Sequence, residues 1–192
     1  MRYITVMGMQ RHRFKCIVTA LCLSVGFSGP GFAQQTTLDD LYQDLAASDE
    51  ETYARIERQI IAQWEQSGSA AMDLLLRRGK EALEDGQPEV AVEHFTALID
   101  HAPDFAQGYY GRASSYFLLG MTGPALDDIR QTLALNPRQF EAIGGLASIM
   151  EELERPQDAL ELYQMILTMN PNSVEILGAV ARLELQLEGL AL

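Results

Sequence analysis

Small and large apolar residues recur at a fixed interval of 34 residues between Met72 and Asn172. Each large residue follows a small one by four positions, which places both on one helical face. Two helices approach closely only where the side chains at their crossing are small, so the pattern predicts packed helix pairs repeated along the chain. The ladders are Gly79, Ala113, Ala147 and Ala181 in the first helices, Ala91, Ala125 and Ala159 in the second, and Phe95, Ile129 and Tyr163 beside them.

Proline closes each predicted helix pair at the same interval. It lacks an N–H group and clashes with the preceding turn, so it stops the second helix. Pro88 and Pro156 suit the first turn of two second helices. Gly86 and Gly120 end two first helices, whereas Glu154 takes the equivalent place in the third repeat, whose inner turn departs from the pattern. The closing residues are Pro103, Pro137 and Pro171.

A 34-residue period with this arrangement resembles the tetratricopeptide repeat, whose consensus ends in Ala-x3-Phe and a closing Pro. Leu75, Tyr109 and Ile143 stand where the consensus has tryptophan. The resemblance implies an all-α, right-handed helical solenoid that works by binding other proteins. The solenoid domain is expected over residues 70–192, with repeats at about 72–105, 106–139 and 140–173.

Two helices predicted within residues 34–69 do not follow the repeat pattern. In the second of them Ile56, Ile60 and Trp64 fall at i, i+4 and i+8 and form one apolar stripe. Glu57 stands where the repeat register requires alanine, so this pair is not a regular repeat. Because a solenoid needs terminal caps, we expect the pair to cover the exposed face of the first repeat, with Trp64 in the core.

A capping helix is predicted at the other end, over residues 174–188. Ser173 is suited to cap its first turn. Leu177, Ala181 and Leu185 are expected to form its buried stripe, since Ala181 continues the small-residue ladder.

The first 33 residues have the three parts of a secretory signal peptide. A basic segment precedes the apolar run 16–27, and cleavage is expected after Ala33. A transmembrane helix needs about 20 apolar residues, so we expect an exported bacterial protein, periplasmic or secreted, without stable membrane insertion after cleavage. The true start is open among Met1, Met7 and Met9.

Cleavage would remove both cysteines and leave 10 basic and 27 acidic residues, a formal net charge of −17. Such a surface repels nucleic acid and favours a neutral or basic protein partner, or it only keeps an exported protein soluble. Arg77 and Arg78 form the one basic cluster of the mature sequence. Pairing with neighbours such as Glu81 at i, i+4 is preferred there over contact with an acidic partner.

In the resembled family the first helices line a concave groove that receives a peptide or a partner helix. Tyr and Arg often carry interface energy, so the groove is expected to hold aromatic area in its middle and a cation near each end. The alternative is that Tyr110 and Phe117 pack against the neighbouring repeat. The predicted binding residues are Lys80, Tyr110, Ser114, Phe117, Ser148 and Arg182.

Catalytic chemistry finds no support in the sequence. His94 and His101 are seven residues apart, without the i, i+4 spacing and further ligands of a metal site. Gly-x-Gly-x-x-Gly and complete phosphate-loop patterns are absent. We therefore expect no enzyme activity, no cofactor and no metal.

Two functions remain open from the sequence. The preferred one is an interaction adaptor or scaffold of the bacterial envelope that binds a protein segment in the groove. The alternative is a structural subunit that self-associates or is built into an envelope complex through its convex or N-terminal surface. The sequence leaves the oligomeric state undecided.

Overall fold

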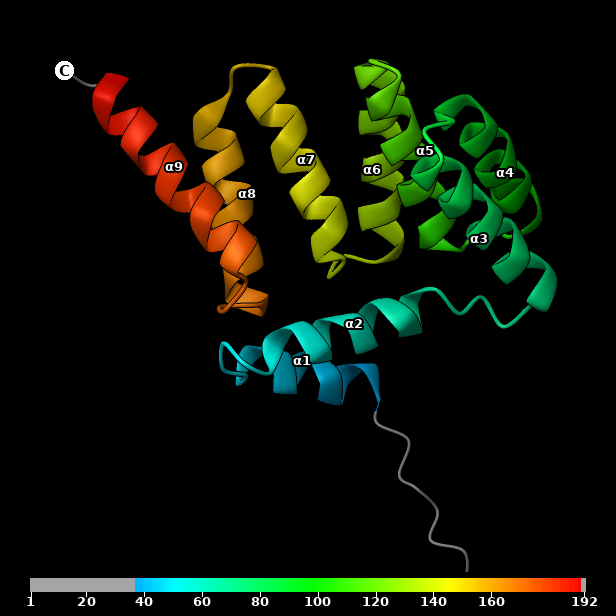
Figure 1. Ribbon diagram of the computed structural model, residues 1–192, viewed down its shortest axis with the longest axis horizontal. Coiled ribbons are helices and arrows are strands. Elements are labelled where there is room, and N and C mark those ends of the chain that lie inside the picture. Colours follow the sequence, from blue (N-terminus) through cyan, green and yellow to red (C-terminus); the bar gives the residue numbers. More distant parts are fainter. Residues whose placement is uncertain (1–36, 191–192) are drawn as a thin grey trace, which may run out of the picture. The chain divides into compact units, whose positions relative to one another are not determined.

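The computed structural model describes residues 37–190, and every regular element in that range is an α-helix (Figure 1). From α3 onward each helix packs beside the next, which confirms the predicted all-α solenoid. No helix in this range is long and apolar enough to cross a membrane. The predicted signal peptide, Met1–Ala33, lies outside the described residues. The helices are α1 (Leu38–Ala46), α2 (Tyr53–Trp64), α3 (Ala70–Glu84), α4 (Pro88–His101), α5 (Ala106–Leu118), α6 (Thr122–Leu135), α7 (Phe140–Glu152), α8 (Pro156–Met169) and α9 (Val174–Leu190).

The helix boundaries repeat at the interval of the prolines. Helices α4, α6 and α8 begin and end 34 residues apart, and each stops two residues before its closing proline. At the crossings Ala91, Ala125 and Ala159 are completely buried, as the ladders predicted. Each repeat is therefore one antiparallel pair, α3 with α4, α5 with α6 and α7 with α8.

The inner turns are alike in all three repeats, including the one that lacks glycine. Gly86 and Gly120 have φ angles of 69° and 70°, and Glu154 adopts a φ of 57° at the same register. This left-handed conformation suits glycine and is strained for a residue with a Cβ atom. The third turn thus keeps the repeat geometry in spite of its sequence.

The first repeat is organised around Phe95, which is completely buried. A Cβ atom at Gly79 would lie 2.5 Å from the Phe95 ring, and one at Gly111 would lie 2.4 Å from it. The ring therefore fills the space that the missing side chains leave on α3 and α5. Glycine at these two positions is a packing requirement that joins the first repeat to the second.

The N-terminal pair packs elsewhere than the sequence suggested. The Trp64 ring lies 4.8 Å from the ring of Phe140, at the start of α7, and Trp64 donates a hydrogen bond of 3.1 Å to the Tyr42 hydroxyl. Trp64 is in the core as predicted, but it is the core of the second and third repeats. The first repeat has a separate apolar cluster around Phe95. The expected cover of the first repeat is therefore wrong.

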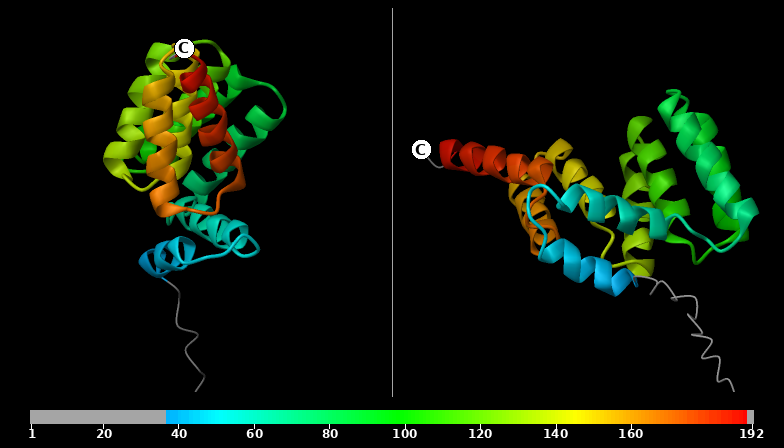
Figure 2. Two further views of the ribbon diagram at one scale, coloured as in Figure 1. Left: turned by 90° about the vertical axis from the view of Figure 1, so that its left-hand side faces the viewer. Right: turned by 60° about the horizontal axis from the view of Figure 1, so that its bottom comes forward.

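The N-terminal pair lies across the ends of the later helices (Figure 2). Polar contacts hold it there. Arg138, in the α6–α7 turn, pairs with Asp39 and lies 3.9 Å over the Tyr42 ring. Asn172, in the α8–α9 turn, donates a hydrogen bond to the backbone of Ser48. Helix α2 has the predicted apolar stripe, but such a stripe fits several apolar surfaces, and these turn residues select one.

The predicted buried stripe of α9 is also wrong. Leu177 is 45% exposed and Leu185 is 71% exposed, and Ala181 lies on the same exposed face. Val180 and Leu183 are buried instead, because α9 packs on α8 through the opposite face. In a complete repeat the face that carries Leu177 contacts the second helix of its own pair. Because no helix follows α9 within residues 37–190, this face stays uncovered there.

Candidate functional site

Three adjoining cavities lie along the first helices of the repeats, α3, α5 and α7. Tyr110 borders all three cavities. We call these three cavities together the groove. Tyr110 lies on α5 and is half-buried. Burial is the main cause that raises the pKa of its hydroxyl, so Tyr110 stays neutral and able to donate a hydrogen bond.

Four of the six predicted binding residues line one of these cavities, which we call the Phe117 pocket. It has a volume of about 250 Å³ and lies between α5 and α7. Its floor is apolar, with Ala113, Ile129 and Ile149. The hydroxyl groups of its two serines donate hydrogen bonds to backbone carbonyls of their own helices. The predicted residues that it brings together are Tyr110, Ser114, Phe117 and Ser148.

Lys80 borders a smaller cavity of about 130 Å³, together with Tyr110 and Ser114. Its ammonium group pairs with the carboxylate of Glu65, directly after α2. The predicted cation at this end of the groove is thus present and exposed, but it is engaged within the chain.

Arg182 is exposed on α9 and is likewise engaged. Its guanidinium donates hydrogen bonds of 2.6 and 3.0 Å to the two carboxylate oxygens of Glu151. The Tyr163 hydroxyl donates to the same carboxylate at 3.0 Å. The Arg182 guanidinium is the first cause that lowers the pKa of Glu151, so this pair remains charged over a wide pH range.

The third cavity is acidic and was not predicted. It has a volume of about 380 Å³ and is bordered by carboxylates from three helices, Glu57 of α2, Glu141 of α7 and Glu175 of α9. We call it the acidic pocket. Asn170 and Tyr163 also border it. It shares Tyr110, Gly145 and Ser148 with the Phe117 pocket.

Burial and the charge of neighbouring carboxylates raise the pKa values of two of the carboxyl groups in this pocket, Glu141 and Glu57. The pKa of Glu141 rises to about 7, first through burial and also through the charges of Glu65 and Glu57, while Lys80 opposes the rise. Burial, followed by the charge of Glu175, raises the pKa of Glu57. A positive ligand would relieve both effects.

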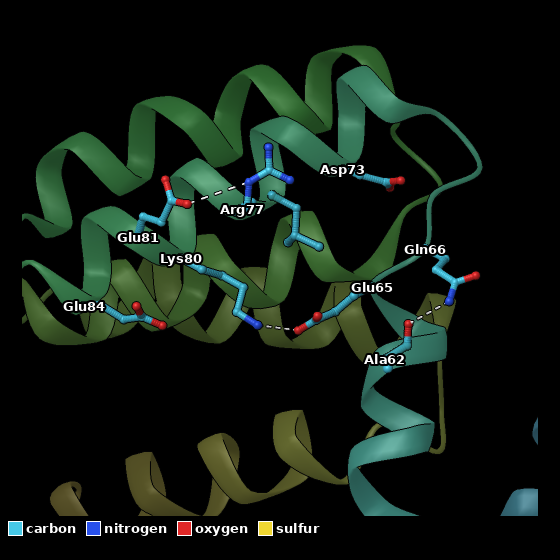
Figure 3. Close-up of a pocket in the computed structure, with 9 residues that line it drawn as sticks. Ala62, Glu65, Gln66, Asp73, Arg77, Lys80, Glu81 and Glu84 are labelled. Atoms are coloured by element: carbon cyan, nitrogen blue, oxygen red, sulfur yellow. Dashed lines mark hydrogen bonds and ion pairs between the residues drawn. The ribbon is translucent and has the colours of Figure 1, made fainter.

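A wider hollow of about 490 Å³ lies between the end of α2 and helix α3 (Figure 3). Its charged side chains largely satisfy one another. Figure 3 shows Lys80 pointing to Glu65 and Arg77 pointing to Glu81. The distance between Arg77 Nε and Glu81 Oε1 is 3.7 Å. The preferred i, i+4 pairing of Arg77 is thus confirmed, and nothing in this hollow marks a ligand.

Sequence reasoning missed Glu57 and Asn170 as groove residues. Within residues 37–190 no group of three or more His, Cys, Asp or Glu side chains is arranged to hold a metal ion. One feature of the sequence could have indicated the acidic pocket: Glu57 is a carboxylate in the predicted N-terminal helical region, at a position where the repeat register requires alanine. Its position in the groove follows only from the packing of α2, which the sequence did not predict.

Comparison with known families decides the classification. The sequence profile of the tetratricopeptide repeat family matches residues 76–121 and 125–174, together half of the chain. The chain belongs to the tetratricopeptide repeat family. It is 29% identical over 128 residues to a TPR repeat-containing protein of Rhizobium etli, a match that covers 66% of this chain and 63% of the relative. The chain thus spans less than two thirds of that relative.

Solved tetratricopeptide repeat domains share the fold. The first such domain of Spaghetti (RPAP3), solved with the HSP90 peptide SRMEEVD, superposes with a TM-score of 0.57 at 23% identity, covering 61% of this chain and 93% of that one. The Sgt2 domain of Aspergillus fumigatus gives a TM-score of 0.59 at 18% identity, covering 64% and 83%. At these identities the likeness concerns the architecture alone.

Proposed function

We propose that this protein is an interaction adaptor of the bacterial envelope that binds an extended segment of another protein in its groove. The observation that carries the proposal is the Phe117 pocket, an apolar cavity bordered by an aromatic ring and by hydroxyl groups. Cavities with apolar floors and a few polar groups are the usual form of binding sites. The RPAP3 domain, solved with a peptide, supports the idea that this fold accommodates such a segment.

The envelope part of the proposal rests on the predicted signal peptide, Met1–Ala33. Export would deliver a cysteine-free chain with a net charge of −17 to an oxidising compartment, where it needs no disulfide. The strong negative charge favours a neutral or basic protein partner and disfavours nucleic acid.

Affinity capture from envelope extract tests this function. The native chain is compared with the Tyr110→Ala/Phe117→Ala variant, and mass spectrometry identifies what each retains. The control is Leu153→Ala/Met165→Ala, two exposed apolar residues that do not line the groove. We expect a partner that the native chain and the control retain and the groove variant loses at unchanged helicity. Equal retention by all three proteins would contradict the proposal.

One observation favours the alternative of a self-associating subunit. On α9 an apolar stripe is open to solvent, and Val174, Leu177 and Leu185 are 55%, 45% and 71% exposed. Contiguous exposed apolar area commonly marks a protein interface. Light scattering at micromolar concentration tests it: an oligomer that Leu177→Ser/Leu185→Ser converts to monomer supports self-association, and a native monomer excludes it.

A further inference from the structure

Within the described part of the chain, the three carboxylates of the acidic pocket are not neutralised by ion pairs, although the charge of Arg58 lowers the pKa of Glu57. Among residues 37–190 no ion pair within 4.0 Å involves Glu57, Glu141 or Glu175. Lys80 lies close enough to lower the pKa of Glu141, but its ammonium group is paired with Glu65. Like charges gathered in a half-buried cavity repel one another, so the pocket gains most from a ligand that brings positive charge.

Asn170 gives an independent sign of a ligand. Its side chain borders the same pocket and is 1% exposed. Neither its amide nitrogen nor its carbonyl oxygen has a hydrogen-bond partner among the described residues. The amide lies near the Glu57 carboxylate and restrains the rise of its pKa, but without hydrogen-bond geometry. A buried amide is nearly always hydrogen-bonded, and leaving one unsatisfied costs about 1–3 kcal/mol.

The geometry favours an organic cation over a metal ion. Within residues 37–190 the acidic side chains do not come together as a metal-ligand cluster, and the cavity of about 380 Å³ is large for a bare ion. A guanidinium group is planar, keeps its charge and presents five N–H donors to several acceptors at once. Three carboxylates and the Asn170 carbonyl supply such acceptors. Tyr110 also borders the cavity, and guanidinium groups are attracted to aromatic rings.

We propose that the acidic pocket binds the guanidinium group of an arginine in the segment that occupies the groove. This rests on the proposed function, which supplies the segment. The acidic pocket and the Phe117 pocket share Tyr110, Gly145 and Ser148, so one segment reaches both. An apolar side chain would enter the Phe117 pocket and a nearby arginine the acidic one. The bound segment thus combines an apolar residue with an arginine.

Nuclear magnetic resonance of the full chain tests the arginine site without knowledge of the partner. The probe is N-acetyl-arginine-N-methylamide, and the matched uncharged probe is N-acetyl-citrulline-N-methylamide, both added at constant ionic strength and pH 8. The readout is the side-chain amide signal of Asn170, identified by its loss in Asn170→Ala. We expect a saturable shift with the arginine probe and at least tenfold weaker binding of the citrulline probe.

Charge-removing variants complete the test. Glu141→Gln is expected to weaken binding of the arginine probe about tenfold, which corresponds to about 1.4 kcal/mol. Glu57→Gln is expected to weaken it as well. Glu89→Gln, on the exposed start of α4, is the control and leaves binding unchanged. Equal shifts with both probes, or unchanged binding in Glu141→Gln and Glu57→Gln, would overturn the proposal.

The two proposals fail in distinguishable ways. If the affinity-capture partner depends on Tyr110 and Phe117 while the arginine probe does not bind, the arginine site is wrong and the adaptor function stands. If the probe binds as described while capture is insensitive to the groove variant, the arginine site stands and the segment-binding function is wrong.

Discussion

At the scale of single residues, Glu154 adopts a left-handed backbone conformation that is unfavourable for a residue with a Cβ atom. It takes the left-handed φ of 57° that glycine supplies in the other two repeats, and its side chain is exposed. The strain of a non-glycine residue there is about 1–2 kcal/mol. The repeat geometry thus prevails over the local preference.

Glu154→Gly is therefore expected to stabilise the protein. Relief of strain exceeds the entropy that glycine adds to the unfolded chain, so the free energy of unfolding should rise by about 0.5–1 kcal/mol. Urea denaturation measures the change. The control is Glu161→Gly, in the interior of α8, where the same substitution should cost about 1 kcal/mol of helix stability. A loss of stability in Glu154→Gly would show that the turn is unstrained.

Gly111 illustrates the opposite case, in which a missing side chain is required. A Cβ atom there would lie 2.4 Å from the buried Phe95 ring, so Gly111→Ala should destabilise the protein by about 1–3 kcal/mol. Gly178, on α9, has nothing within 4 Å of an added Cβ, and Gly178→Ala should stabilise by up to about 1 kcal/mol through helix propensity. If the two variants had the same melting temperature, the Phe95 ring would have room to move away from the added methyl group, and the prediction would be wrong.

Glu141 predicts a dependence of stability on pH. Its pKa is about 7 in the folded protein against an ordinary 4.5, so the native state binds the proton more tightly. Its contribution to the free energy of unfolding is therefore complete below about pH 4.5 and is lost as the pH rises through 7. Glu141→Gln should equal the native protein near pH 4 and exceed its stability by up to about 3 kcal/mol at pH 8, the free energy that corresponds to a pKa shift from 4.5 to about 7. Urea denaturation at both pH values measures this, and a constant difference would contradict it.

At the scale of elements, the sequence predicted the helices well because their signals are local. The closing prolines end α4, α6 and α8, and the small-residue ladders lie at the helix crossings. The apolar stripe of α2 was also predicted correctly, including Trp64. Where that pair packs depends on contacts between distant residues, such as Trp64 with Phe140, which no local pattern encodes.

Trp64→Ala tests this packing of the N-terminal pair. Loss of a buried tryptophan typically costs about 3–5 kcal/mol, and here it removes the contact with Phe140 and the hydrogen bond to Tyr42. Hydrogen exchange should show α1 and α2 losing protection while α3 and α4, which have a separate apolar cluster, keep theirs. If all helices lost protection equally, the N-terminal pair would not unfold separately from the repeats. If no helix lost protection, the pair would not pack through Trp64.

In the candidate site, too, features set by the local repeat pattern were predicted, and features set by tertiary packing were not. Tyr110, Ser114, Phe117 and Ser148 were predictable, since the repeat register places them on successive first helices. Lys80 and Arg182 were placed correctly at the surface, but their ion pairs with Glu65 and Glu151 depend on tertiary packing. The acidic pocket was beyond prediction, because Glu57 joins Glu141 and Glu175 only through the position of α2.

At the scale of the whole molecule, charge and cavities favour one kind of partner. In the proposed function, the net charge of −13 for the entire chain, or −17 after the expected cleavage, would attract basic segments over long distances. The acidic pocket then offers a local place for one positive group, next to an apolar pocket. Long-range attraction and local recognition thus favour the same class of segment.

Photo-crosslinking tests the central claim, binding of a segment in the groove, most directly. The photoreactive amino acid p-benzoyl-phenylalanine replaces Phe117 in the full-length protein in living cells, and a matched protein carries it at Met165, an exposed residue outside the groove. The account predicts a discrete adduct with another protein from position 117 and none from position 165, with the crosslinked segment containing an arginine. Equal adducts from both positions, or adducts only with further copies of this chain, would contradict it.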